Sequence, residues 1–430
     1  MCAIALTLSI TTFYREPNMK IHAQELPNQI AQETTPIDYT IKEDGVLSLP
    51  KDIKHIGIYQ FYGNKNIKKV SIPDYIQSIE EEAFNNCTSL KEVSIADSVT
   101  YVGRQAFGNC TALNKVTISK KMRSISQSMF AKCTALSSIS IPKNITTIED
   151  SAFSYSGLKE VTIPNSVKTI EDSAFMGCDR LTKITLPNNI EQISGNMLSY
   201  CTKLKEITIP KSVTEIGKEA FAHCTSLESI TIPNGVVHIQ PKTFYDCTNL
   251  TDISLPESLT SIESRTFSGC ASIHDITVPN RVTSIKEYAF EYCTELKYIV
   301  LPQSIRCIEP MAFYRCNALM DIYYQGSKHD WDTIKNSEYY EDLKGITIHY
   351  MYDENQSKED TSTTASTSET SNTTAITTTN TTTTTPQEDV KPSKKSTTSP
   401  LSKYKGRIVT SLILLEVLDI VMLILKDKIF

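Results

Sequence analysis

The stretch "ITIPKSVTEIGKEAFAHCTSLESITIP", from Ile207 to Pro233, contains one full period of a repeat and decides the fold of this chain. Its two Ile-Pro steps end at Pro210 and Pro233, which are 23 residues apart. Self-similarity at a period of roughly 20 to 50 residues is typical of solenoids and repeat arrays. The stretch therefore predicts a stack of similar coils.

The same pattern extends in both directions with the consensus C-T-x-L-x-x-I-x-I-P-x-x-V-x-x-I-x-x-x-A-F-x-x. Twelve coils fit it between about Ile41 and Arg315, and a thirteenth begins at Cys316. The aromatic position is Phe in every coil but one, where it is Leu198. A coil has seven or eight apolar side chains that it cannot bury alone, so we expect neighbouring coils to share one continuous core.

The order of residue types within a coil predicts its local structure. The alternation in Glu206–Ile209 predicts a short strand, which the following proline ends, and the V-x-x-I step predicts a second extended or turning segment. The acidic and small residues before Ala-Phe, as in Glu149–Phe153, suit the first turn of a short helix. The expected fold class is therefore an α/β repeat solenoid with short parallel strands.

Ten of the twelve cysteines recur at one position of the repeat: Cys87, Cys110, Cys133, Cys178, Cys201, Cys224, Cys247, Cys270, Cys293 and Cys316. We expect these to be buried free thiols that act as small hydrophobic side chains. Parallel stacked side chains give poor disulfide geometry, and no C-x-x-C pair indicates zinc. Cys307 occupies a position that is polar, His or Tyr in other coils, so we expect an exposed thiol there, reactive or available for pairing.

The run quoted above resembles the BspA-type leucine-rich repeats, also called the Treponema pallidum type. "DIYYQGSKHDWDTIK", Asp321 to Lys335, resembles the cap of such arrays, a strand followed by a tryptophan-bearing helix, which we place at about 317–350. The resemblance covers about Ile41 to Tyr350 and implies a leucine-rich repeat array of about twelve 23-residue coils. It also implies a surface or secreted protein of host-associated bacteria or protists, of which several are adhesins.

Composition and motifs argue against other functional classes. The net charge of −6 gives no reason to expect nucleic-acid binding, which usually needs a strongly basic patch. The seven histidines show no recurring relation to a nucleophile, and no metalloprotease, nucleophile-elbow or Walker motif is present in the sequence. We expect no enzyme, cofactor or metal. For acidic doublets such as Glu171–Asp172, calcium binding is the alternative to a helix-dipole role.

Two groups of residues are candidates for binding. The outward residue between the two strand isoleucines forms a row, whose ligand-binding candidates are Thr162, Thr185, Thr208, Thr231, Ser254 and Thr277. The alternative is a solvated sheet face with no ligand. Aromatic residues gather at the C-terminal end as a candidate cap site, Tyr298, Tyr323, Tyr324 and Trp331. The alternative there is that the aromatic side chains seal the open core.

The flanks of the solenoid, which we place at residues 33–353, differ from it in composition. Residues 1–32 are a leader or signal-like segment without a basic start, and the alternative is a loosely packed extension. Residues 354–402 are Thr/Ser-rich and predict a disordered stalk. Residues 403–430 predict a membrane-anchoring helix. Because Glu416 and Asp419 lie near its middle, an amphipathic helix on a membrane or partner is the alternative.

Together these observations favour a binding module at the cell surface, membrane-anchored or secreted. It would mediate adhesion or protein–protein interaction with a host or neighbouring cell, with membrane contact through its C-terminal helix and no nucleic-acid partner. The alternatives are a structural or spacer protein of the cell envelope without a ligand, a glycan-binding module at the aromatic cap, and an intracellular scaffold.

Overall fold

The computed structural model describes residues 37–334 and 343–353. The chain divides into two units between Thr364 and Ala365, and the second unit lies wholly outside the described residues. The expected leader, stalk and membrane-anchoring helix also lie outside them, so these three expectations remain predictions. The description that follows concerns the repeat array alone.

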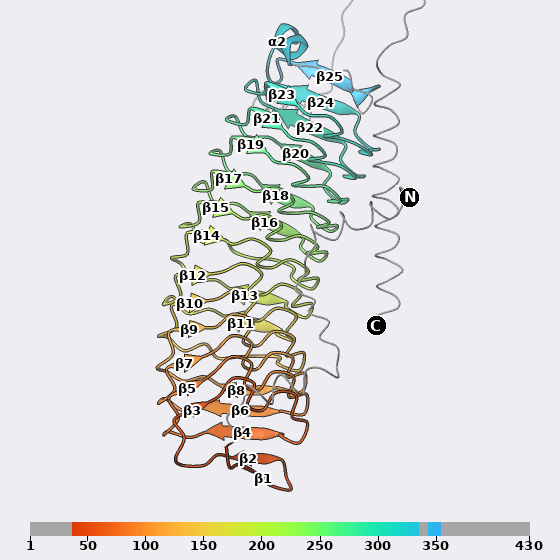
Figure 1. Ribbon diagram of the computed structural model, residues 1–430. Helices are drawn as coiled ribbons and strands as arrows, with labels where there is room; N and C mark the ends of the chain where they lie inside the picture. The colour runs from red at the N-terminus through yellow and green to blue at the C-terminus, as the bar shows by residue number, and fades with distance from the viewer. Residues whose placement is uncertain (1–36, 335–342, 354–430) are drawn as a thin grey trace, which may run out of the picture. The chain divides into compact units, whose positions relative to one another are not determined.

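The array is a solenoid of about thirteen coils of about 23 residues, and two columns of short strands run along its length (Figure 1). A first strand comes from the I-x-I step of a coil and a second strand from the V-x-x-I step. Paired strands of successive coils are parallel and in register at 23 residues, as for Ile230 with Ile253. The predicted solenoid and its core-facing isoleucines are confirmed.

The first strands carry most of the described sheet. They are β2 (Val46–Ser48), β4 (Lys69–Ile72), β6 (Glu92–Ile95), β8 (Lys115–Thr117), β11 (Glu160–Thr162), β13 (Lys183–Thr185), β16 (Ser229–Thr231), β18 (Asp252–Ser254), β20 (Asp275–Thr277), β22 (Tyr298–Leu301), β24 (Asp321–Tyr324) and β25 (Thr347–Tyr350). At the N-terminal end, β1 (Thr40–Ile41) pairs with β2 in the antiparallel sense. The coil around Thr208 contributes one isolated bridge, Glu206 with Ser229.

The second strands are shorter, at two residues each. They are β3 (His55–Ile56), β5 (Ser78–Ile79), β7 (Tyr101–Val102), β9 (Ser124–Ile125), β10 (Thr147–Ile148), β12 (Thr169–Ile170), β14 (Gln192–Ile193), β15 (Glu215–Ile216), β17 (His238–Ile239), β19 (Ser261–Ile262), β21 (Ser284–Ile285) and β23 (Cys307–Ile308). Their isoleucines and valine point into the core, whereas the preceding residues lie at or near the surface.

The expectation of a short helix before Ala-Phe is wrong, because the third side of each coil consists of successive turns. In the coil of Phe153, Ser151 has φ 55° and Tyr155 has φ 54°, and left-handed residues four positions apart interrupt any α-helix. The turns are bonded to the next coil instead, since the N–H of Phe153 donates to the carbonyl of Ala174 at 2.8 Å. The fold is therefore almost purely a β- and turn-based solenoid.

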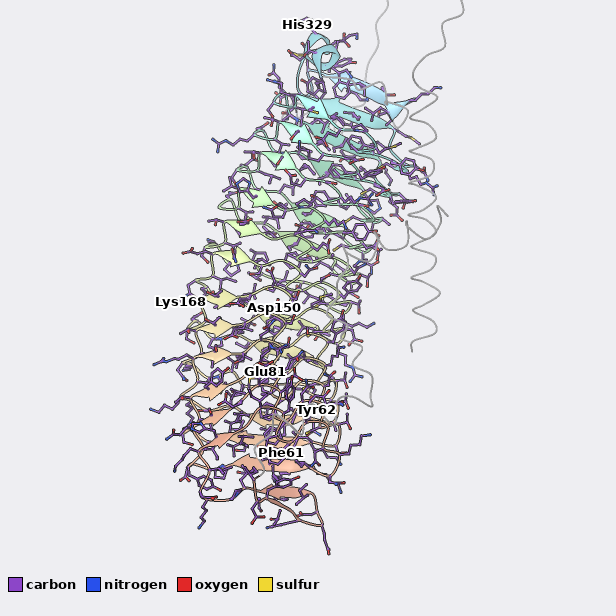
Figure 2. The ribbon with its side chains drawn as sticks, viewed as in Figure 1. Phe61, Tyr62, Glu81, Asp150, Lys168 and His329 are labelled. Atoms are coloured by element: carbon purple, nitrogen blue, oxygen red, sulfur yellow. The ribbon has the colours of Figure 1, made fainter. Side chains whose placement is uncertain are left out.

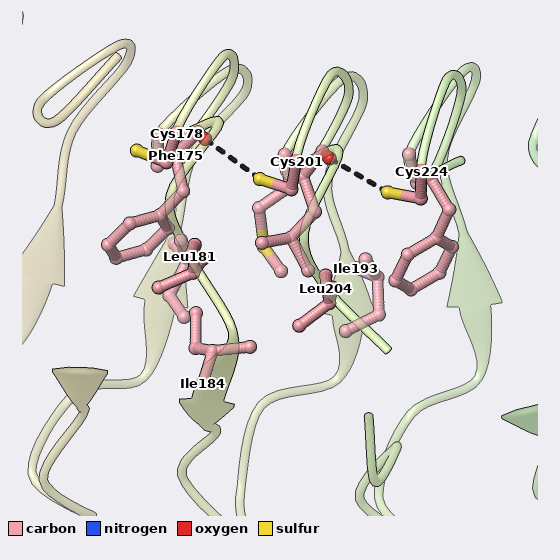
Figure 3. Close-up of a cluster of buried hydrophobic side chains, with 14 of the residues drawn as sticks. Phe175, Cys178, Leu181, Ile184, Ile193, Cys201, Leu204 and Cys224 are labelled. Carbon is pink, nitrogen blue, oxygen red and sulfur yellow. Dashed lines mark hydrogen bonds between the residues drawn. The ribbon is translucent and has the colours of Figure 1, made fainter. Parts of the chain in front are cut away.

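The core is continuous along the array, as the repeat predicts. Six phenylalanines stack from Phe61 to Phe175, and five more stack from Phe221 to Phe313, with centroids 5.0–5.9 Å apart. Leu198 separates the two stacks and is itself fully buried. Figure 3 shows that Cys178, Cys201 and Cys224 lie beside these side chains in successive coils.

The C-terminal end has the strand-and-helix cap that the sequence predicts. After β24, Ser327 caps α2 (Lys328–Thr333), and Asp330 completes the capping box. Trp331 lies on this helix and packs against Tyr324, with ring centroids 5.2 Å apart. His329 marks the same helix at the tip of the array (Figure 2). The cap therefore covers the last coil and closes the core.

Candidate binding surfaces

We call the outward surface of the first strands the strand face. Its outer row contains the six predicted residues, Thr162, Thr185, Thr208, Thr231, Ser254 and Thr277, and all six are exposed. Thr162 is in register with Thr185, and Thr231 with Ser254. These side chains follow one another from coil to coil because the side-chain period of a strand is two and the isoleucines on either side face the core.

Charged residues occupy two flanking rows of the strand face, two and three positions before the outer row. In the N-terminal coils, Lys69 lies 3.0 Å from Glu92, and Lys115 lies 3.7 Å from the same carboxylate. These two lysines, Lys69 first, lower the pKa of Glu92. Farther along, Lys205 pairs with Glu228 at 3.0 Å. Since all of these side chains are substantially exposed, each pair stabilises the fold little and its charge stays accessible to a partner.

The outer row changes character at the C-terminal end. Val300, Tyr323 and His349 continue the row beyond Thr277, in register from strand to strand. The Tyr323 ring stacks on His349 at 4.5 Å and meets Tyr298 edge-on at 5.6 Å, while Val300 is buried. We call Tyr298, Tyr323 and His349 the aromatic block.

Carboxylates surround the aromatic block. His349 Nε2 lies 2.7 Å from Asp321 Oδ1. Burial, and then the charge and hydrogen bond of Asp275, raise the pKa of Tyr298. The block is thus an acidic as well as an aromatic surface, although 38% of Tyr298 remains exposed.

The four aromatic residues predicted as one cap site are divided by the sheet. Tyr323 lies on the outward face of β24, and the next residue, Tyr324, points the other way and is fully buried against Trp331. Tyr324 and Trp331 therefore belong to the core closure, and a ligand on the surface can contact only Tyr298 and Tyr323 of the predicted four.

A second cluster, on the turn side of the coils, had no signal in the repeat consensus. The Tyr200 ring stacks on His223 at 4.2 Å, and His223 Nδ1 lies 3.2 Å from Asp246 Oδ2. Burial raises the pKa of Tyr200, and Tyr155, Glu219 and Asp246 add to the shift. These residues occupy one position of successive coils, so aligning that variable position against the period would have found the cluster.

The cysteine ladder has no reactive chemistry. All ten ladder thiols are buried and free, as predicted. Burial raises the pKa of Cys133, Cys178 and Cys224 to about 12, so these side chains are neutral at physiological pH and are poor nucleophiles. Cys307 is also a free thiol, and it is half-buried rather than exposed.

The acidic residues before Ala-Phe have a structural role between coils. Glu171 Oε2 accepts a hydrogen bond from the backbone N–H of Asp150 at 3.0 Å, and Glu309 accepts one from Glu287 at 3.1 Å. The predicted helix-dipole role is wrong because these segments are turns. Within residues 37–334 and 343–353, no group of three or more His, Cys, Asp or Glu side chains has the arrangement of a metal site.

The described part of the chain contains no helix with the length and apolar character needed to cross a bilayer. This finding covers α2, whose six residues form the cap.

Comparison with known families identifies the class of this solenoid. The sequence matches the BspA type leucine rich repeat region over residues 54–182, 146–249, 168–282, 214–344 and 261–385, which together span most of the chain. The chain therefore belongs to the BspA-type leucine-rich repeat family, as its repeat predicts.

Several solved structures are similar. A leucine rich cell surface protein from Faecalibacterium prausnitzii is 26% identical, with 71% of this chain and 99% of that one covered and a TM-score of 0.45. A leucine-rich repeat protein from Eubacterium ventriosum is 24% identical, with 75% and 95% covered and a TM-score of 0.49. One from Bacteroides ovatus is 26% identical, with 74% and 99% covered and a TM-score of 0.37. No curated protein matches the chain.

Proposed function

We propose that this chain is a cell-surface binding protein that mediates adhesion or protein–protein interaction through its strand face. The observation that carries the proposal is the row of exposed Thr and Ser residues, flanked by charged residues, that follows successive coils from Ser71 to Thr277. Such a row offers hydrogen-bond donors, acceptors and charges at a regular spacing of about 4.8 Å per coil, which suits an extended protein surface.

The flanking sequences support display outside the cell. The leader-like residues 1–32 would direct export, the Thr/Ser-rich residues 354–402 would hold the solenoid away from its attachment point, and residues 403–430 would contact the membrane. A spacer protein of the cell envelope would share this layout, but it would need no polar row.

A glycan is the second candidate ligand, and the aromatic block is the surface that favours it. Tyr298 and Tyr323 present two rings at right angles beside Asp275 and Asp321, so that apolar ring surface and hydrogen-bond acceptors lie together. This site is smaller than the strand face and lies at one end of it.

Surface display is tested by treating intact cells with a protease and detecting peptides of the solenoid. Release from intact cells is expected. Release only after lysis would refute surface display and favour an intracellular scaffold.

The binding surface is tested on protein and glycan arrays with three single variants of the full chain. Thr208→Lys on the strand face should abolish protein binding, and Tyr298→Ala should abolish only glycan binding. Thr169→Lys is the matched control, since Thr169 is exposed beside the second strands. Equal binding by all three variants and the unsubstituted chain would refute the strand face as the site.

A further inference from the structure

The strand face is electrically polarised along the solenoid. Its flanking rows in the first three coils from Lys68 to Lys115 contain four lysines, Lys68, Lys69, Lys91 and Lys115, and one glutamate, Glu92. Its last five coils contain Glu228, Asp252, Asp275 and Asp321 against Lys297 alone, with His274 also present. The N-terminal end is therefore positive and the C-terminal end negative, which makes the face complementary to an inverted copy of itself.

We propose that two copies of this chain associate antiparallel through their strand faces. A two-fold axis that lies in the interface parallel to the strands reverses the solenoid axis and preserves the strand direction. Each residue then opposes the same position of the coil on the other copy. With the twelve coils from Ser71 to Tyr323 fully overlapped, the first coil of one copy faces the last coil of the other.

This register brings opposite charges together at four places. Lys69 opposes Asp321, Lys115 opposes Asp275, Lys159 opposes Glu228, and Lys183 opposes Glu206, and the two-fold axis generates each pair twice. Lys91 opposite Lys297 is the one like-charge pair of the flanking rows. The lysine side chains are available for this pairing, since Lys115 is 71% exposed and Lys69 is 53% exposed.

The charge pattern also selects this register over its neighbours. A shift by one coil in one direction places Glu92 opposite Asp275 and Glu160 opposite Glu206. A shift by one coil in the other direction places Glu92 opposite Asp321. Because like charges across an interface disfavour association, both neighbouring registers are repulsive.

Side-chain size agrees with the same register. The large residues at the C-terminal end of the outer row oppose the small ones at its N-terminal end, with Tyr323 against Ser71 and Val300 against Ser94. Thr and Ser oppose each other everywhere between these ends. The arrangement also tolerates curvature, because a concave face keeps the pairs at the ends and a convex face keeps those near the centre.

The expected association is weak and depends on salt. Twelve coils at about 4.8 Å, with strands of about 10–13 Å in width, offer roughly 600–700 Å² per copy. Stable interfaces bury about 800 Å² per partner, so a reversible dimer is expected. Since the pairs are exposed, we expect at least a tenfold weaker association at about 0.5 M salt than at about 0.05 M.

This inference rests on the proposed function and names its partner as a second copy of the chain. An antiparallel pair places the C-terminal ends of the two solenoids at opposite ends of the complex. If residues 354–430 attach each copy to its own cell, the two attachment points lie on opposite sides, as contact between neighbouring cells requires.

Disulfide trapping tests the register in the full chain. A tagged Thr117→Cys chain mixed with an untagged Thr277→Cys chain should form a disulfide-linked heterodimer, because these positions oppose each other. Each variant alone should give no more dimer than the unsubstituted chain, which controls for Cys307. Mixing Thr117→Cys with Thr162→Cys should also give none. Equal trapping in both mixtures, or none in either, would overturn the proposal.

Charge exchange tests the energetic basis by sedimentation of the full chain at low salt. Lys115→Glu and Asp275→Lys should each weaken self-association at least tenfold, and the variant with both changes should recover it. Lys168→Glu, an exposed lysine on the second-strand side (Figure 2), makes the same charge change and should have no effect. A chain that is monomeric at every salt concentration, or equal effects of Lys115→Glu and Lys168→Glu, would refute the inference.

These outcomes are separable from a failure of the proposed function. Protease release from intact cells combined with array binding but no self-association would leave a surface receptor for a different protein. Self-association without protease release would retain the dimer and remove its role between cells.

Discussion

The Sγ of Cys201 donates a hydrogen bond to the backbone carbonyl of Phe175 in the preceding coil at 3.3 Å (Figure 3). Each of the ten ladder cysteines makes the equivalent bond to the aromatic position, or to Leu198, one coil earlier, at 2.9–3.3 Å. The ladder thus satisfies a carbonyl that the turn leaves inside the core. A purely apolar side chain of the same size could not do this.

Cys201→Ala should lower the free energy of unfolding by about 1–2 kcal/mol, through the lost donor and the small cavity. Cys201→Ser should cost less than Cys201→Ala, because it keeps a donor, and Ser156 already occupies this position in the native chain. Urea unfolding followed by circular dichroism measures both. A greater loss for Ser than for Ala would show that the carbonyl needs no donor.

The ladder should also make the fold sensitive to alkaline pH. Burial raises the pKa of thiols such as Cys133 to about 12, from an ordinary value of 9.0. A raised folded-state pKa stabilises the fold fully below pH 9, and this stabilisation is lost as the pH rises from 9 towards 12. Each buried thiol should cost about 1.4 kcal/mol per pH unit in that window.

Thermal unfolding between pH 8 and 10.5 checks this expectation, with Cys133→Ser as the comparison. The variant should lose less stability than the unsubstituted chain over the same interval. Parallel curves for the two proteins would mean that the ladder thiols are not responsible.

The sequence was sufficient for the coil, its core and the exposure of residues such as Thr208, because a period of 23 residues and a period of two define which side chains face inwards. It was insufficient for the turns, since Ser151 and Tyr155 are left-handed without being glycines. The division of Tyr323 from Tyr324 was available from strand alternation. The charge register across two copies needed the parallel in-register strands, which fix the opposing positions.

Lys132→Gly should raise stability by about 0.5–1 kcal/mol. Lys132 has φ 58°, where a Cβ is strained by about 1–2 kcal/mol, and Gly177 and Gly269 occupy the same position in other coils. Lys143→Gly is the matched control, an exposed lysine outside the left-handed set, and it should lose about 0.5–1 kcal/mol. Chemical unfolding of both variants decides the question, and destabilisation of equal size would argue against strain at Lys132.

Tyr324→Phe should change stability by less than about 0.5 kcal/mol, whereas Tyr324→Ala should cost about 3–5 kcal/mol. The ring is fully buried against Trp331, but its hydroxyl has no hydrogen-bond partner among the described residues, so the ring alone holds the cap on the last coil. Tyr323→Ala, one residue away on the outward face, should cost less than Tyr324→Ala. Hydrogen exchange of β24 and β25 reports the opening of the cap for each variant. If Tyr323→Ala opened the cap as much as Tyr324→Ala, the core closure would extend across both faces of the sheet, and the aromatic block would be part of it.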